Sequence, residues 1–126
     1  MNHDEFVGHV QHRAQLPSRG DAETIIRATL ETLGERLLPE AAANVAAQLP
    51  PELGRHLIDH PFAHLSVRDF NERVAVREHT DVGKAAFHAR CVLDIMRTAI
   101  SYGAVRKLRL QLPEEFQPLL GTSVES

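Results

Sequence analysis

One short motif occurs twice in the chain, and its spacing limits the folds that the chain can adopt. Residues 48–52 read QLPPE and residues 111–115 read QLPEE, at an offset of 63. A motif that recurs together with matching apolar positions is typical of an internal repeat, so the sequence indicates an ancestral duplication. At the same offset the chain pairs Ala22 with Ala85, Arg27 with Arg90, Leu30 with Leu93, Ala41 with Ala104, and Leu57 with Leu120.

Helical patterns precede the motif in both halves of the chain. Phe6 and Val10 have the spacing of one helical face, and Phe70 and Val74 repeat this pattern. Asp21 suits the N-cap of a second, longer helix. No segment has the pattern of a β-strand. The apolar stripes of the two long helices are Ile26, Leu30, Leu33 and Leu37 in the first half and Ala85, Ala89, Val92 and Met96 in the second.

These patterns predict an all-α fold in which two tandem four-helix repeats pack as one helical domain. A chain of 126 residues has the length of one ordinary domain. Only 5 % of the residues are aromatic, so small and aliphatic side chains must fill the core, as they do between closely packed helices. The predicted boundaries are 1–126 for the domain, 1–58 for the first repeat, 59–66 for a solvated linker, 67–121 for the second repeat, and 122–126 for a tail.

Each copy of the motif is interpreted as a corner between two helices. Proline has a fixed φ and no N–H, so Pro50 and Pro113 suit the first turn of a new helix. Gln48 and Gln111 are expected to bond carbonyl groups that the end of the preceding helix leaves without partners. The alternative is that the two glutamines line a symmetric pocket.

Several short motifs together span nearly the whole chain. They are the acid–Phe run Asp4–Phe6, the segment LETLGERL at residues 30–37, and the two QLP corners. This combination resembles a bacterial family known only as a domain of unknown function, number twenty-two sixty-seven. The second half departs from the pattern, because LDIMRTAI at residues 93–100 replaces an LGERL-like run. The resemblance implies an all-α fold and supplies no catalytic residue.

Both long helices carry an arginine followed four residues later by an acid. The pairs are Arg27 with Glu31 and Arg90 with Asp94. On an exposed helix face such a pair contributes only about 0.3–0.5 kcal/mol. The alternative is that each arginine clamps a neighbouring helix or an acidic ligand, because the guanidinium group suits bidentate recognition.

Histidines are frequent in the segment RHLIDHPFAH at residues 55–64. His56 and His60 can share one side of a helical turn and bind a metal ion such as Zn²⁺. Pro61 takes the chain off the helix directly afterwards, and the segment lacks HExxH and a cysteine partner. The sequence therefore favours a solvated linker and no bound cofactor, with His56 and His60 as weak metal candidates.

Composition and motifs argue against several classes of function. The net charge is −3, and no aromatic residue accompanies the basic cluster at 106–109, so nucleic-acid binding is not expected. The chain shows no apolar run long enough to span a bilayer, no signal peptide, no phosphate-binding glycine loop and no nucleophile elbow. The single Cys91, in an apolar helical setting, fits a reduced cytoplasm.

We therefore predict a cytoplasmic, non-catalytic interaction protein that binds a protein partner or itself. Paired helical repeats present extended surfaces, which suits this role. The alternative is a protein that binds a small ligand or a metal ion at a site between the two repeats. That site would draw on His56, His60, Arg27 and Arg90.

Overall fold

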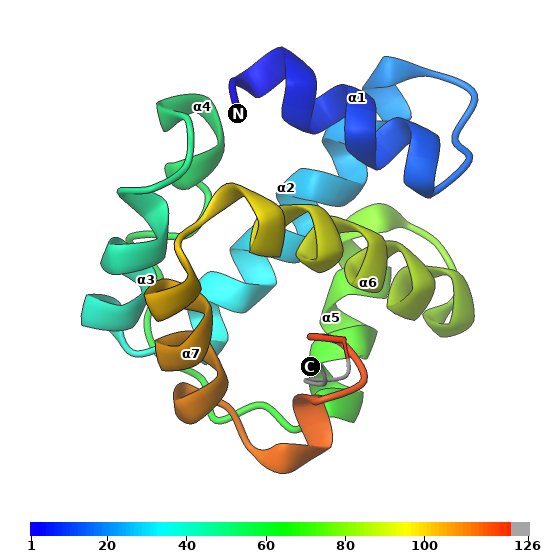
Figure 1. The fold of residues 1–126 in the computed structure, drawn as a ribbon. Coiled ribbons are helices and arrows are strands. Elements are labelled where there is room, and N and C mark those ends of the chain that lie inside the picture. The colour runs from blue at the N-terminus through cyan, green and yellow to red at the C-terminus, as the bar shows by residue number, and fades with distance from the viewer. Residues whose placement is uncertain (122–126) are drawn as a thin grey trace.

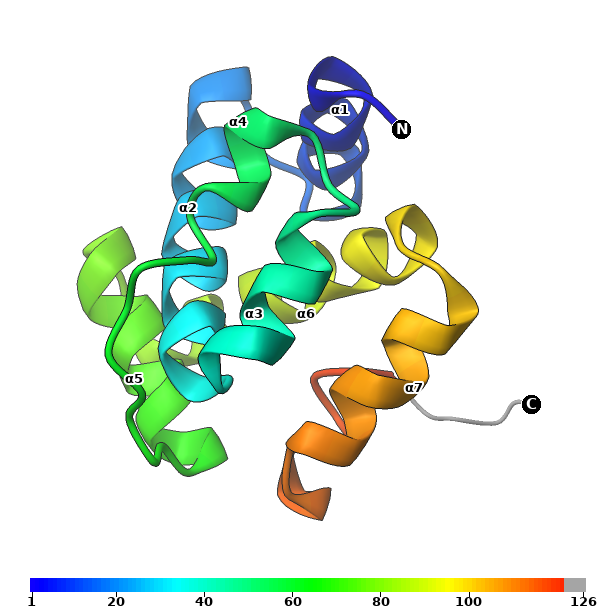
Figure 2. The same cartoon turned by 90° about the vertical axis from the view of Figure 1, so that its left-hand side faces the viewer.

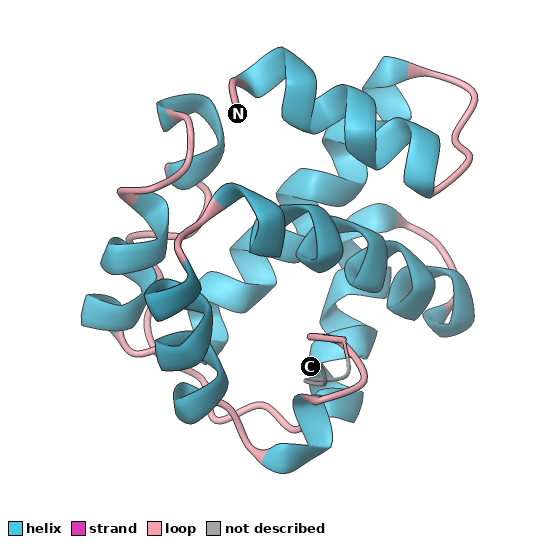
Figure 3. Cartoon of the chain, in the orientation of Figure 1, coloured by secondary structure: helices cyan, strands magenta, loops and turns pink. Residues whose placement is uncertain are grey.

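The computed structural model describes residues 1–121, which form seven α-helices and one 3₁₀ helix and contain no strand (Figures 1 and 3). The predicted all-α class is therefore confirmed. The predicted tail, residues 122–126, lies outside the described residues. The elements are α1 His3–Arg13, α2 Arg19–Arg36, α3 Pro39–Ala46, α4 Pro51–Gly54, α5 Val67–Glu78, α6 Val82–Ala99, α7 Tyr102–Gln111 and η1 Glu114–Phe116.

Side-chain caps fix where the main helices begin. A capping box formed by Asn2 and Glu5 starts α1, and one formed by Ser66 and Asp69 starts α5. In each box the N-cap side chain accepts from a backbone N–H, and the acid accepts from the N-cap N–H. The N-cap residue of α6 is Asp81.

The start of α2 differs from the prediction that Asp21 is its N-cap. Ser18 is the N-cap, and its Oγ accepts a hydrogen bond from the backbone N–H of Asp21 at 3.1 Å. Serine and aspartate are both good N-cap residues, so local propensity did not separate them. Asp21 instead lies in the first turn, where its negative charge favours the N-terminal end of the helix dipole.

The core lies among the two long helices, α2 and α6, and the shorter α1 and α5 that pack on both of them (Figures 1 and 2). Phe6, Val10, Phe70 and Val74 are fully buried there, in line with the helical faces that the sequence predicted. Helices α3 and α7 lie next to each other beside these four helices, and their buried side chains, among them Val45 and Leu108, belong to the same core. No helix of the described residues is long and apolar enough to cross a bilayer.

The two QLP corners join α3 to α4 and α7 to η1. Pro50 is the N-cap of α4 and Pro113 is the N-cap of η1, one position earlier than the first turn in which they were expected. Pro51 takes the first-turn position of α4 instead. Leu49 and Leu112, the leucines within the corners, are buried. Each corner therefore ends one helix, buries a leucine and starts the next helix.

The segment between α4 and α5, which was predicted as a solvated linker at 59–66, has mostly exposed or half-buried side chains and also contacts α2. The backbone N–H of Ala63 donates to the carbonyl of Glu35 at 2.8 Å, and the side chain of Leu65 is buried. The Nε–H of Arg36 donates to the carbonyl of Leu65 at 2.8 Å. The Arg36 guanidinium lies 5.6 Å from the ring centre of Phe62, within the same segment. The last turns of α2 therefore hold this connection in place.

Candidate binding cleft

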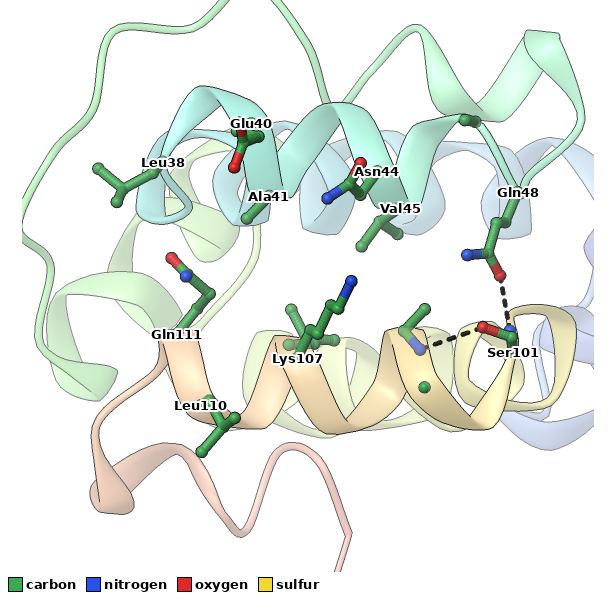
Figure 4. A pocket seen from close by; sticks show the side chains of 14 residues that line it. Leu38, Glu40, Ala41, Asn44, Val45, Gln48, Ser101, Lys107, Leu110 and Gln111 are labelled. Carbon is green, nitrogen blue, oxygen red and sulfur yellow. Dashed lines mark hydrogen bonds between the residues drawn. The ribbon is translucent and has the colours of Figure 1, made fainter.

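A cleft of about 630 Å³ lies between α3 and α7 (Figure 4). We call it the α3/α7 cleft, and its walls are formed by Leu38, Glu40, Ala41, Asn44, Val45, Ala47 and Gln48 on the α3 side and by Ser101, Gly103, Ala104, Lys107, Leu108, Leu110 and Gln111 on the α7 side. A smaller pocket, of about 470 Å³, is lined by Gly8, Gln11, His12, Gln15 and Leu16.

The two walls use corresponding positions of the chain. Every residue of the α3 wall has a counterpart in the α7 wall at the offset of 63 that relates the two QLP motifs. The helices run in opposite directions, so Gln48 lies beside Ser101 at one end and Gln111 lies nearer Leu38 at the other (Figure 4). The corresponding positions therefore run in opposite order along the two walls, and Gln48 and its counterpart Gln111 lie at opposite ends of the cleft.

The floor of the cleft is apolar and its rim carries exposed leucines. Val45 and Leu108 are buried, and Ala41 leaves room between the two helices. At the rim, the side chains of Leu38 and Leu110 are 51 % and 82 % exposed. Large aliphatic side chains with this much exposure, placed beside an apolar floor, are typical of a surface that another molecule covers.

Gln48 connects the two walls through a hydrogen bond that the sequence did not indicate. Its Oε1 accepts from the backbone N–H of Ser101 at 2.6 Å, whereas the prediction had the side chain donating to carbonyls of its own helix end. The hydroxyl of Ser101 in turn accepts from the N–H of Ala104. Gln48 therefore satisfies a donor at the start of α7. Gln111 lines the cleft as well, so both glutamines border the same pocket.

Two charged side chains lie on opposite walls of the cleft. Glu40 lies on the α3 wall and Lys107 on the α7 wall (Figure 4). Both are exposed, and neither takes part in an ion pair among residues 1–121. The residue that corresponds to Glu40 on the other wall is Gly103, and the residue that corresponds to Lys107 is Asn44. Both are uncharged, so the two walls differ most in charge.

The predicted pair of the first half is formed, and its acid has a second partner. Arg27 Nε lies 3.1 Å from Glu31 Oε2 on α2. Arg77, from α5, places its Nε 3.5 Å from Glu31 Oε1. The clamp on the neighbouring helix is therefore made by Arg77, which the sequence analysis did not consider.

The predicted pair of the second half, Arg90 with Asp94, is not formed in the described residues. Asp94 is bound instead by Arg13 from α1, at 3.0 Å, and by Arg97 of its own helix, at 2.7 Å. These two guanidinium groups take both carboxylate oxygens. Arg90 is exposed and lies 5.9 Å from the ring centre of Phe87.

Arg13 and Arg77 are the residues that sequence reasoning missed here. They correspond at the offset of 64 that pairs Phe6 with Phe70, so an identity at that offset could have revealed them. Arg13 reaches from α1 to α6, and Arg77 reaches from α5 to α2. Each therefore joins the first helix of one half to the long helix of the other.

A further carboxylate, Glu35, extends the contact between α2 and α5. Arg77 Nη1 lies 2.7 Å from Glu35 Oε1, and Arg73 Nη1 lies 3.0 Å from Oε2. Burial alone would raise the pKa of Glu35, but the hydrogen bonds and charges of Arg77 and Arg73 outweigh burial and lower the pKa. Arg77 also donates to the hydroxyl of Thr32 at 2.6 Å. Arg73 and Arg77 therefore join α5 to α2.

The imidazole of His60, one of the two metal candidates, bonds to the backbone of the other, His56. Nε2 of His60 lies 2.8 Å from the backbone carbonyl oxygen of His56. A carbonyl oxygen only accepts, so this nitrogen carries its proton and is not free to bind a metal. Burial, followed by the nearby charge of Arg55, lowers the pKa of His56. No three His, Cys, Asp or Glu side chains in the described residues are grouped to hold a metal ion.

A second buried acid, Glu78, lies at the end of α5. Its Oε1 accepts a hydrogen bond from Nδ1 of His88 on α6 at 2.7 Å, and the Glu78 side chain is only 3 % exposed. Burial raises the pKa of Glu78, and the hydrogen bond and charge of His88 offset this only in part.

We expect Glu78→Gln to stabilise the protein more at about pH 7 than at about pH 4. A carboxyl group whose pKa is raised by folding favours the folded state when it is protonated. That contribution is present below the ordinary pKa of 4.5 and is lost as the pH rises through the raised value. Urea denaturation of both proteins at the two pH values checks this. Exposed Glu115→Gln controls for the loss of one charge, and a benefit that is larger at the lower pH would contradict the expectation.

A comparison with known protein families identifies the family of the chain. A family model described as "Uncharacterized conserved protein (DUF2267)" matches residues 3–119. The chain belongs to the DUF2267 family. The resemblance drawn from the LGERL segment and the QLP corners is therefore confirmed. A comparison with curated proteins gives no match. Because the family is described as uncharacterised, membership assigns no activity to this DUF2267 protein.

Proposed function

We propose that this DUF2267 protein is a non-catalytic interaction protein that binds a protein partner at the α3/α7 cleft. The observation that carries the proposal is the pair of exposed leucines, Leu38 and Leu110, at the rim of an apolar floor. A groove between two antiparallel helices accepts the side chains of a third helix, which is a common mode of protein recognition.

The proposal includes no catalysis, no cofactor and no nucleic-acid partner. Arg109, within the basic cluster of α7, donates to the side chain of Gln117 and to the carbonyls of Leu120 and Gly121. One of the three bases of this cluster is therefore engaged within the chain, whereas nucleic-acid modules carry a large positive surface. We also propose a bacterial cytoplasm as the location of the protein. Burial raises the pKa of the single Cys91 thiol, which supports a cysteine that stays reduced and unreactive.

We also propose that the chain is one domain made of two tandem four-helix repeats, with the boundaries predicted from the sequence. Support comes from the order of helix lengths, since α1 and α5 have 11 and 12 residues and α2 and α6 have 18 each. The capping boxes of α1 and α5, the crossing contacts of Arg13 and Arg77, and the paired walls of the cleft support it further.

One observation favours the alternative, a protein that binds a small ligand or a metal ion between its halves. The volume of about 630 Å³ falls in the range of ligand pockets, about 300–1,000 Å³, and the cleft takes its walls from both halves. The residues that the sequence suggested for such a site are not among those that line the cleft: His56, His60, Arg27 and Arg90. A ligand-induced rise in melting temperature, or metal found by elemental analysis of the purified protein, would favour this alternative.

Site-specific photocrosslinking tests the protein-binding proposal. A photoreactive phenylalanine analogue in place of Leu110, at the rim, should give one discrete adduct in the native cytoplasm. The same analogue in place of Val76, which is 73 % exposed on α5, is the matched control and should give none. Mass spectrometry identifies the captured protein. Equal adducts from both positions, or none from Leu110, would contradict a binding role for the cleft.

A further inference from the structure

We infer that the protein bound at the α3/α7 cleft is a second copy of this chain, with α3 of each copy lying on α7 of the other. This inference rests on the proposed binding role of the cleft and names the partner. A twofold axis that runs along the cleft relates the two copies, so the same patch is used on both sides of the interface.

The charges of the two helices favour this partner. Residues 39–48 contain one acid, Glu40, and no base. Residues 102–111 contain three bases and no acid, and Lys107 is the one that lines the cleft. Placing α3 on the partner's α7 sets Glu40 beside the partner's Lys107, and the symmetry forms this ion pair twice. Placing α7 on the partner's α7 would instead bring like charges together, which disfavours that arrangement.

The exposed leucines favour the same arrangement. Leu38 and Leu110 lie toward one end of the cleft, on opposite walls, while Gln48 and Ser101 occupy the other end (Figure 4). A rotation by 180° about an axis along the cleft keeps each residue at its own position along that axis. It lays the α7 wall of one copy over the α3 wall of the other. The partner's Leu110 then lies over Leu38. A single symmetry operation therefore pairs the apolar rim residues and the opposite charges together.

The correspondence between the walls adds to the fit. Because corresponding residues line both walls, each wall presents a similar backbone shape to the partner. Ala41 lies toward the same end of the cleft as Leu38, and its small side chain leaves space for a leucine from the partner. The charges of Glu40 and Lys107 then select the pairing of unlike helices over the pairing of like helices.

Analytical ultracentrifugation of four proteins tests the inference. The wild type should form a dimer whose dissociation constant rises with salt, because exposed ion pairs are screened. Glu40→Lys and Lys107→Glu should each weaken the dimer about tenfold, by placing like charges in contact. The double swap, Glu40→Lys with Lys107→Glu, should restore the dimer. All of these positions are exposed, so folding should be retained, and circular dichroism verifies this.

Two controls make the result specific to the cleft. Glu23→Lys makes the same charge change on the exposed side of α2 and should leave the dimer unchanged. Leu110→Ser should weaken the dimer, whereas Val76→Ser should not. A double swap that fails to restore association would overturn the inference.

If ultracentrifugation shows that the wild type is a monomer, the crosslinking result decides which proposal fails. If Leu110 still captures a different protein, the second-copy inference fails and the binding role of the cleft stands. If Leu110 captures nothing, both fail. A dimer that the charge variants leave unaffected would show that the copies meet elsewhere, which also contradicts the inference.

Discussion

Gly34→Ala is expected to lower the free energy of unfolding by about 1–3 kcal/mol, even though alanine is the better helix former. Gly34 lies inside α2, where the carbonyl group of Leu57 occupies the space that a Cβ would need. A Cβ at this position would overlap the Leu57 carbonyl oxygen and come within 2.8 Å of Cδ2 of His60. The first of these atoms belongs to the backbone, and Leu57 is fully buried, so the overlap cannot be relieved by moving one side chain.

Gly8→Ala is the matched control for this experiment. Gly8 lies in α1 and is exposed, and no neighbouring helix or side chain comes within 4 Å of the place that a Cβ would occupy. The same substitution should therefore stabilise the protein by up to about 1 kcal/mol, as helix propensity predicts. Urea denaturation of the two variants and the wild type measures both effects. A gain of stability at both glycines would contradict the close packing of residues 57–60 on α2.

The helices themselves could be predicted because their signals are local. Capping residues and apolar faces lie within a few positions of each other, so Phe6 and Phe70 were recognised as core residues before their surroundings were known. The role of Gly34 depends on Leu57, which is distant along the chain. The LGERL segment was recognised as a motif, but its physical reason required the fold.

The difference between local contacts and contacts distant along the chain also explains which features of the candidate site could be predicted. The pair Arg27–Glu31 was predicted from its i,i+4 spacing and is formed. The equivalent pair in the second half is lost, because Arg13 approaches Asp94 from another helix. Gln48 likewise bonds the start of α7, across a sequence distance that local reasoning does not cover. The cleft was predicted only as an alternative, through its two glutamines.

The second large effect is expected at Arg36, another LGERL residue with distant partners. Arg36 is only 5 % exposed, and it has no ion pair with a carboxylate among the described residues. Its guanidinium lies 5.6 Å from the ring centre of Phe62 and 5.5 Å from that of Phe116. The faces of the two rings are electron-rich, so they stabilise a cation that lacks an acidic partner. Phe116 belongs to η1, so this contact joins the end of α2 to the C-terminal part of the fold.

Arg36→Met should lower the free energy of unfolding by about 2–4 kcal/mol, because it removes both the donor to the Leu65 carbonyl and the cation between the rings. Methionine keeps most of the length of the side chain, so little of the loss comes from an empty volume. Arg90→Met, which removes an exposed arginine near Phe87, should change stability by less than about 0.5 kcal/mol.

A double-mutant cycle isolates the contact with the ring of Phe62, which is itself partly exposed. Phe62→Leu should cost at least about 0.5 kcal/mol less in the Arg36→Met protein than in the wild type, because the ring then has no cation to contact. Equal costs in the two backgrounds would mean that Arg36 acts only through the Leu65 carbonyl. If Arg36→Met lowers the free energy of unfolding as little as Arg90→Met does, the connection between the two halves does not depend on the buried cation.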